Sequence, residues 1–270
     1  MILAIDCGNT RVKWGLCEAG VREVDASGQA PGAPNAANAP NGPNVPKASG
    51  WHALGAAPLA DIARLEADWS SMPAPSRIVI ANVAGESARR ALLEPLARFA
   101  VEPRWISAQA VQCGVTNGYA DPGQLGADRW AALVGAWHLL RGACLVVHAG
   151  TATTVDMLSA QGLHCGGIII AGVELMKRAL AQHTAGLPLA QGRFAGEPRC
   201  TADAIESGCL HAQAGAIERM YARLEGLAGI EAGAVCLLAG GNAGRILPLL
   251  GIPVRAVDNL ALEGLARIGA

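Results

Sequence analysis

The sequence predicts an α/β protein with a mixed β-sheet in each of two similar halves. Two observations carry this prediction. Short apolar runs with strand character alternate with helix-like segments, and a similar order of elements occurs twice along the 270 residues. No residue-level repeat accompanies the second observation, so the duplication is one of architecture. We place the border near residue 117, which gives domains 1–117 and 118–270.

The first half has the predicted order β-β-β-α-β-α-β. Residues 2–6 and 12–17 form two strands, and the Gly/Asn turn between them favours a hairpin. The later elements are a strand around 51–54, a helix over 59–69, a strand over 77–83, a helix over 86–99 and a strand around 104–106.

One segment of the first half has the composition of a mobile surface insertion. Residues 26–50 contain five prolines, four asparagines and seven alanines, and Val45 is their only larger aliphatic side chain. Such a segment buries too little apolar surface to offset the entropy lost on ordering. We therefore expect the fold to tolerate this insertion at its surface.

The second half follows a helix predicted over 130–141, whose apolar residues lie on one face and suggest a homodimer seam. Its predicted strands are 145–148, 153–158, 163–170, 234–238 and 254–257. Its predicted helices are 173–182, 202–225, 243–249 and 260–268.

The composition excludes several classes of protein. The chain has 21 Lys+Arg against 22 Asp+Glu and no basic cluster, which argues against binding to nucleic acid. No apolar run approaches the 18 or so residues of a membrane span, and the start has no secretory signal, so we expect a cytoplasmic protein. The eight cysteines are scattered without a C-x-x-C pair, which predicts reduced thiols and no structural zinc site.

The first segment that could carry chemistry is the turn after the first strand. Gly8 lets a ligand approach the backbone, Asn9 and Thr10 offer hydrogen bonds to phosphate oxygens, and Lys13 supplies a positive charge. Asp6 could hold a hydrated Mg²⁺ ion, since Mg²⁺ takes one or two carboxylates and keeps its waters. The alternative is a plain hairpin turn with a capping aspartate.

The second segment is Gly126-Ala127-Asp128-Arg129, directly before the apolar helix. Asp128 could accept the proton of a substrate hydroxyl while the Arg129 guanidinium binds an anionic group. The alternative is an aspartate that only caps the helix.

The third segment runs from His148 to Asp156 and repeats the strand, glycine turn and strand of the first. Thr151 follows the glycine of this turn, and a Thr-rich hairpin is the alternative. Two such turns, one per half, could hold a polyphosphate in an interdomain cleft. Gly240 and Gly241 end a later strand, where a base or sugar could lie against the backbone, although such pairs also make ordinary turns.

With these motifs in this order, the chain resembles the type III pantothenate kinases of the acetate and sugar kinase/Hsp70/actin superfamily. The resemblance implies two ribonuclease H-like domains, actin-like in arrangement, with ATP, Mg²⁺ and pantothenate as ligands. It also implies a homodimer. By resemblance the nucleotide ligands are Asp6, Gly8, Asn9, Thr10, Lys13 and Thr151, and from the residues themselves we add Arg11, Gly240 and Gly241. The implied pantothenate residues are Tyr119, Gly126, Ala127, Asp128, Arg129 and Thr201, of which Asp128 accepts the proton and Thr201 acts across the dimer interface.

One position departs from the family pattern. Where the family has an aspartate that coordinates a monovalent cation, this chain has His148. A neutral imidazole is a poor ligand for K⁺ and an imidazolium would repel it. The resemblance therefore does not decide whether this chain requires the K⁺ or NH₄⁺ ion of the family. Our hypothesis is that His148 itself replaces the cation's charge.

The resemblance implies phosphorylation of pantothenate to 4′-phosphopantothenate, the first step of coenzyme A synthesis. Two alternatives remain: a kinase for another small hydroxyl compound, and a non-catalytic accessory factor of gene expression with the same fold. Retention of Asp6, Asp128 and Arg129 argues against the second.

Overall fold

The computed structural model describes residues 1–18, 50–189, 191–227 and 233–270. Contacts divide the chain into two compact units. Unit 1 is Met1–Arg141 with Gly162–His164 and Asp258–Ala270, and unit 2 is Gly142–Gln161 with Cys165–Val257. Apart from Gly50, the insertion expected at 26–50 lies outside the described residues.

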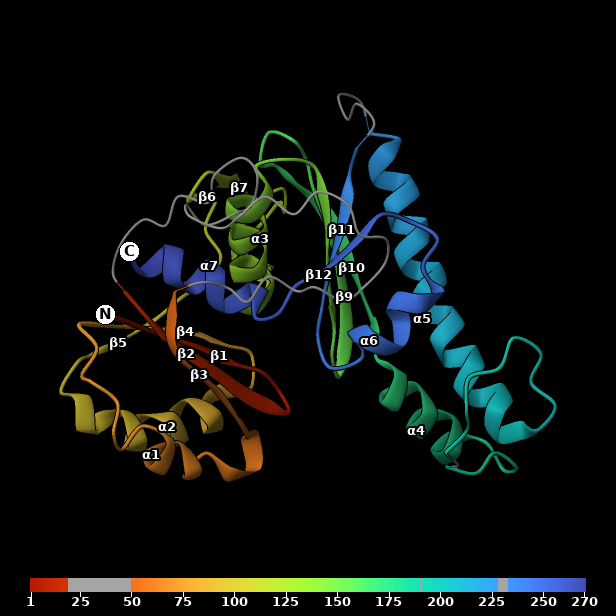
Figure 1. The fold of residues 1–270 in the computed structure, drawn as a ribbon, viewed down its shortest axis with the longest axis horizontal. Coiled ribbons are helices and arrows are strands. Elements are labelled where there is room, and N and C mark those ends of the chain that lie inside the picture. The colour runs from red at the N-terminus through yellow and green to blue at the C-terminus, as the bar shows by residue number, and fades with distance from the viewer. Residues whose placement is uncertain (19–49, 190, 228–232) are drawn as a thin grey trace, which may run out of the picture. The chain divides into compact units, whose positions relative to one another are not determined.

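Unit 1 contains a five-stranded mixed sheet of order β3-β2-β1-β4-β5 (Figure 1). Its strands are β1 (Ile2–Cys7), β2 (Arg11–Cys17), β3 (Trp51–Pro58), β4 (Arg77–Asn82) and β5 (Pro103–Trp105). Strand β2 is antiparallel to β1 and β3, whereas β4 runs parallel to β1 and β5. The predicted hairpin and mixed sheet are confirmed.

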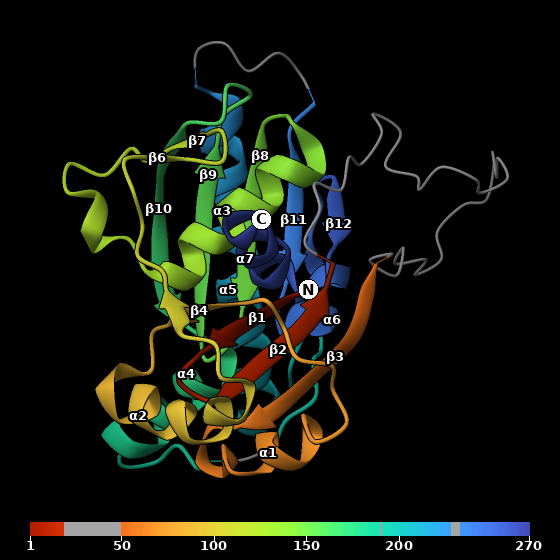
Figure 2. The ribbon, with the colours of Figure 1, turned by 90° about the vertical axis from the view of Figure 1, so that its left-hand side faces the viewer.

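The two faces of this sheet are buried by different residues of the same strand. Leu3 and Ile5 of β1 join a core with Leu65 of α1 (Arg64–Asp68) and Leu92 of α2 (Gly85–Leu96). Side chains of a strand alternate between faces. Ile2 accordingly faces the opposite side, where it meets α7 (Leu260–Gly269) at Gly269. Figure 2 shows α1 and α2 together below this sheet.

Two predicted helices of unit 1 are interrupted. The segment 59–69 consists of a 3₁₀ turn over Leu59–Asp61 and the short helix α1. The N–H groups of Leu65 and Glu66 bond to carbonyl groups only three residues earlier, which is 3₁₀ geometry. Helix α2 likewise ends at Leu96 and continues as a 3₁₀ turn over Ala97–Phe99.

A small hairpin in unit 1 escaped the sequence analysis. Strands β6 (Val111–Gln112) and β7 (Val115–Thr116) pair antiparallel through a two-residue turn. Both turn residues have positive φ, 51° at Cys113 and 81° at Gly114, as a tight hairpin turn requires. Cysteine is not typical of such a turn, so the composition did not reveal it.

Helix α3 (Ala127–Leu140) does not offer the homodimer seam that we predicted from its apolar face. Trp130, Leu133 and Val134 are fully buried within their own chain. Helix α7 packs so closely against α3 that a side chain at Gly264 would collide with the backbone of Ala131. The apolar face of α3 is therefore covered inside unit 1 at Trp130, Leu133 and Val134, and the seam prediction is wrong for this part of the helix.

Unit 2 contains a second five-stranded sheet, of order β10-β9-β8-β11-β12. Its strands are β8 (Cys144–Ala149), β9 (Ala152–Leu158), β10 (His164–Ala171), β11 (Val235–Ala239) and β12 (Val254–Ala256). Strand β8 is antiparallel to β9 and parallel to β11, as β1 is to β2 and β4. The predicted architectural duplication is thus confirmed.

Three helices follow β10 among the described residues of unit 2. They are α4 (Val173–His183), α5 (Thr201–Glu225) and α6 (Ala243–Ile246). The predicted helix 243–249 continues past α6 only as a 3₁₀ turn, where Pro248 has no N–H to donate. Residues Ile205 and Ile217 of α5 pack on Leu145 and Val147 of β8 in one core.

The predicted domains 1–117 and 118–270 remain a prediction. The contact-based units differ from them because α3 and α7 both belong to unit 1. These helices pack against each other, and both contact β4. No described helix is long and apolar enough to cross a membrane.

Candidate active site

The turn between β1 and β2 gathers the first set of predicted ligands. Asp6 lies near the end of β1 with 7% of its surface exposed and is the register partner of Lys13. The Gly8 N–H donates to the Arg11 carbonyl at 3.0 Å and closes the turn. Asn9, Thr10 and Arg11 are exposed at its tip. A buried carboxylate thus stands behind an exposed polar turn.

Asp6 and Asp128 interact electrostatically although 122 positions separate them in the sequence. Burial, together with the negative charge of Asp128, raises the pKa of Asp6 to about 6, and Lys13 opposes both effects. A cation beside these carboxylates would relieve the cost of a buried charge. The donor set therefore fits a hydrated divalent cation.

Asp128 and Arg129 are the last two residues of the predicted segment 126–129, and both lie in the first turn of α3. Asp128 is half-buried and its Oδ1 accepts a hydrogen bond from the Arg129 N–H at 2.8 Å. The N-cap of α3 is Gly126, without a side-chain cap hydrogen bond, so Asp128 is not the N-cap residue that the alternative interpretation required. The bond from the Arg129 N–H involves Oδ1 and is compatible with a role in proton transfer.

The Arg129 side chain is oriented by Tyr119. Arg129 is 6% exposed, its Nη1 donates to the Tyr119 hydroxyl at 3.0 Å, and its guanidinium carbon lies 5.7 Å from the centroid of the tyrosine ring. A guanidinium held by a hydroxyl and a ring presents a fixed fork of donors, which suits a carboxylate. The predicted pair of substrate residues is brought together.

Two residues that hold Tyr119 were missed by sequence reasoning. Asn117 accepts from the Tyr119 N–H at 3.0 Å and donates to the Pro122 carbonyl at 3.2 Å. The ring of His164, which is fully buried, lies 5.3 Å from the tyrosine ring. An Asn near Gly, Asp and Pro is a turn signal that could have indicated Asn117. Nothing local indicates His164, because it comes from β10.

In unit 2 the turn between β8 and β9 repeats the geometry of the turn after Asp6. His148 is the penultimate residue of β8, as Asp6 is of β1. His148 is half-buried and is the register partner of Thr154. The Gly150 N–H donates to the Ala152 carbonyl at 3.1 Å, and Thr151 is exposed at the tip.

The glycine pair after β11 divides into two roles. Gly240 has φ +106°, and a side chain there would meet the Ala149 carbonyl oxygen at 2.4 Å, so only glycine fits. Gly241 is exposed, and a Cβ atom there would meet nothing within 4 Å. Gly240 therefore packs against β8, whereas Gly241 offers open backbone to a ligand.

Two residues that sequence reasoning did not assign to the site hold the Gly150–Thr151 turn. Gly172 donates its N–H to the Thr151 carbonyl at 2.9 Å. Asn242 donates its N–H to the Ala149 carbonyl at 3.0 Å and its Nδ2 to the Gly150 carbonyl at 3.4 Å. The Gly-rich composition at these positions was visible, but their proximity to the turn was not.

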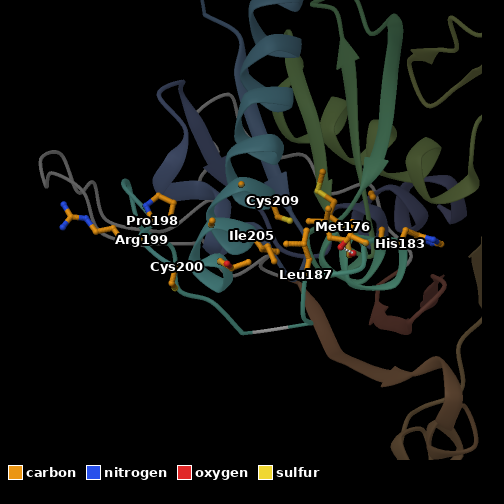
Figure 3. Close-up of a pocket in the computed structure, with 15 residues that line it drawn as sticks. Met176, His183, Leu187, Pro198, Arg199, Cys200, Ile205 and Cys209 are labelled. Carbon is orange, nitrogen blue, oxygen red and sulfur yellow. Dashed lines mark hydrogen bonds between the residues drawn. The ribbon is translucent and has the colours of Figure 1, made fainter.

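Thr201 lies at the start of α5, exposed, on the wall of a groove of about 1060 Å³ between α4 and α5 (Figure 3). Met176, Leu187, Ile205 and Cys209 make much of this wall apolar. The groove belongs to unit 2, whereas Tyr119 and Arg129 belong to unit 1.

The cysteines lie apart from any disulfide or metal cluster in the part of the chain that the structure describes. All eight lie among the described residues, none is in a disulfide, and five are buried. Within the described ranges no group of three or more His, Cys, Asp or Glu side chains could together hold a metal ion.

The two sheets of equal strand order, each with a polar turn after its first strand, define an actin-like α/β fold. The ethanolamine utilization protein EutJ from Carboxydothermus hydrogenoformans shares this fold, with a TM-score of 0.51, 11% identity and coverage of 99% of this chain and 89% of that one.

Sequence comparison identifies the family within this class. The family model described as type III pantothenate kinase matches residues 2–223. The type III pantothenate kinase of Aromatoleum aromaticum is 48% identical over 98% of this chain and 96% of its own length, and that of Nitrosospira multiformis is 44% identical over 99% and 90%. The chain belongs to the type III pantothenate kinase family.

Proposed function

We propose that Asp128 is the proton acceptor in the reaction of this chain, the ATP-dependent phosphorylation of pantothenate to 4′-phosphopantothenate that opens coenzyme A biosynthesis. The observation that carries the proposal is the electrostatic pairing of Asp128 with the buried Asp6. One carboxylate would serve the nucleotide and its cation, and the other the attacking hydroxyl. The effect of the Asp128 charge on the pKa of Asp6 supports this division of roles.

Phosphoryl transfer requires alignment and neutralisation of charge more than covalent help from the protein. In the proposed mechanism Asp128 takes the proton of pantothenate's primary hydroxyl as that oxygen attacks the γ-phosphorus. Arg129 binds the substrate carboxylate, with its guanidinium oriented by Tyr119. Gly126 and Ala127 supply the backbone at the start of α3, beside this pair.

We propose one set of nucleotide ligands at the β1–β2 turn of unit 1 and another at the β8–β9 turn of unit 2. In unit 1 Gly8, Asn9, Thr10, Arg11 and Lys13 surround the end of β1, where Asp6 would hold Mg²⁺ through its waters. Bound Mg²⁺ neutralises phosphate charge. In unit 2 Thr151 would contact ATP from the tip of its turn, and Gly240 and Gly241 would border the nucleoside.

The identity of residue 148 concerns the requirement for a monovalent cation. His148 occupies the strand position in β8 that Asp6 occupies in β1. We propose that a protonated imidazole at this position replaces the positive charge that K⁺ or NH₄⁺ provides in the family. The reaction would then proceed without a monovalent cation.

The proposed homodimer would use unit 2. Leu175, Leu189 and Phe194 are 43%, 63% and 43% exposed, and all three lie in or after α4. Exposed large apolar side chains are typical of association surfaces. Light scattering tests this state, and a monomer would exclude it.

All eight cysteines are free thiols, which is typical of the cytoplasmic location that we propose.

The function is tested by the release of ADP from ATP and Mg²⁺ by the purified chain. We expect release that depends on pantothenate. Release that depends instead on another small alcohol would favour a kinase with a different substrate. No release with any alcohol would favour the non-catalytic accessory factor.

A further inference from the structure

A cluster of charged side chains joins α4, α5 and α6, and two of its members, Lys177 and Glu206, are buried. Lys177 of α4 and Glu206 of α5 are 6% and 5% exposed, and the Lys177 Nζ lies 2.8 Å from the Glu206 Oε2. Arg245 of α6 donates through Nη2 to the other oxygen of Glu206. Burial opposes ionisation of Glu206, but Lys177 and Arg245 together hold its pKa below the ordinary value. Glu206 is therefore a charged anchor for Arg245.

The other terminal nitrogen of the Arg245 guanidinium contacts Asn242, which in turn bonds the candidate nucleotide turn. This nitrogen, Nη1, lies 3.1 Å from the Glu174 Oε1 and donates to the Asn242 Oδ1 at 3.1 Å. Arginine can only donate hydrogen bonds, so it fixes which end of the Asn242 amide faces it. The amide nitrogen must then point the other way, toward the Gly150 carbonyl, which it reaches at 3.4 Å.

These contacts form a continuous path from a buried ion pair to the exposed tip of a turn. Glu206 holds Arg245, Arg245 orients Asn242, and Asn242 bonds the turn at Gly150, next to Thr151. A buried ion pair adds little net stability compared with packed apolar side chains. Its clearer physical consequence here is a defined orientation for the guanidinium and for the amide beyond it.

We propose that Arg245 is a positioning residue that sets the affinity for ATP through Asn242 and the Gly150–Thr151 turn. The inference rests on the proposed contact between Thr151 and ATP. It predicts that changes at Arg245 weaken nucleotide binding and leave the pantothenate contacts of Tyr119 and Arg129 unchanged, because these two residues belong to the other unit.

The first experiment compares Arg245→Gln, Arg245→Lys and the wild type. For both variants we expect a rise of about tenfold in the KM for ATP, with the KM for pantothenate within about twofold. Lysine should not rescue, because one ammonium cannot replace a planar fork that reaches Glu206 and Asn242 together. Calorimetric titration with Mg·ADP, without pantothenate, should show the same weakening. Arg178→Gln, at an exposed position of α4, is the matched control.

The second experiment tests whether Arg245 acts through Asn242. If it does, Asn242→Ala combined with Arg245→Gln should weaken ATP binding no more than Asn242→Ala alone. Independent, additive losses would overturn the inference, and so would equal rises in both KM values. Asn242→Asp keeps an acceptor for Arg245 and removes the donor to Gly150, so it should weaken ATP binding even if the Arg245 variants fold poorly.

Thr151→Val separates this inference from the function on which it rests. If Thr151→Val weakens ATP binding and neither Arg245→Gln nor Asn242→Asp does, the positioning role is wrong and the nucleotide contact stands. If none of the three affects ATP binding while the wild type turns over, the proposed contact at Thr151 is wrong and the inference falls with it.

Discussion

The negative charge of Asp128, at the start of α3, raises the pKa of Asp6, at the end of β1. Two carboxyl groups from distant parts of the sequence thus share one electrostatic environment in unit 1. The first two predictions below follow from this pairing.

The stability of the protein should depend on pH through Asp6. Its pKa rises from the ordinary aspartate value of 3.8 to about 6 in the fold. Between these values the folded state binds more protons, so stability falls as the pH rises through the window and is level above it. The difference corresponds to about 3 kcal/mol as an upper limit. In Asp6→Asn the fall in stability between pH 3.8 and about 6 should disappear. The variant should therefore be more stable than wild type at pH 7.5.

Urea unfolding at pH 5 and pH 7.5, with EDTA to remove divalent cations, measures this effect. Asp61→Asn, at an exposed position of a 3₁₀ turn, is the control for loss of one negative charge. An Asp6→Asn variant with the pH dependence of the wild type would contradict the prediction. The same variant should also lose activity with Mg·ATP.

Asp128→Asn should lose turnover while keeping its fold. Removing the proton acceptor is expected to lower kcat by about 10² to 10⁴, and the amide can still accept the bond from the Arg129 N–H. Steady-state kinetics with circular dichroism measures both properties. Asp68→Asn, which removes only a surface ion pair with Arg64, should retain wild-type kcat. Turnover by Asp128→Asn close to that of the wild type would remove Asp128 from the mechanism.

Tyr119→Phe should weaken pantothenate binding selectively. The buried Arg129 guanidinium loses the hydroxyl acceptor at 3.0 Å but keeps the ring beside it. We expect the KM for pantothenate to rise about tenfold with kcat within about threefold of wild type. Tyr221→Phe, which removes a hydroxyl that donates to the Ala234 carbonyl in unit 2, should lower stability without changing this KM. Equal KM values for the two variants would contradict the role of Tyr119.

Gly240→Ala should destabilise the protein, whereas Gly241→Ala should not. A Cβ atom at position 240 would collide with the Ala149 backbone in a conformation of positive φ. We expect a loss of about 2–4 kcal/mol of unfolding free energy. At position 241 a Cβ atom meets open space, so the change should stay within about 0.5 kcal/mol. Thermal unfolding of both variants compares them, and similar losses would show that Gly240 is not specifically required.

The role proposed for His148 predicts how the enzyme responds to K⁺. Wild-type activity should change less than about twofold when K⁺ replaces an inert cation at constant ionic strength, because the imidazole supplies the charge. His148→Asp should restore a carboxylate at this position and create strong stimulation by K⁺. Strong stimulation of the wild type would exclude the hypothesis.

Much of the fold was predictable because hydrophobic period and turn chemistry are local. The order of strands and helices, the β1–β2 hairpin and the repeat of the same sheet in unit 2 all follow from such patterns. The hairpin turn at Cys113 was not predictable, because its geometry runs against the usual residue preference. The apolar face of α3 was visible, but only packing could show that α7 covers it.

The residues of the candidate site were also predictable only in part. Residue types and spacing were enough to predict Asp6, Asp128 and Thr151 as site residues, because a carboxylate or a glycine turn can be recognised from the residues of its own segment. They could not indicate that His164 lies against the Tyr119 ring, or that Asn242 and Arg245 connect a buried ion pair to the Gly150 turn. These contacts join strands and helices far apart in the chain, and no local rule specifies them. They arise when the sheets bury their apolar faces and bring the ends of separate elements together.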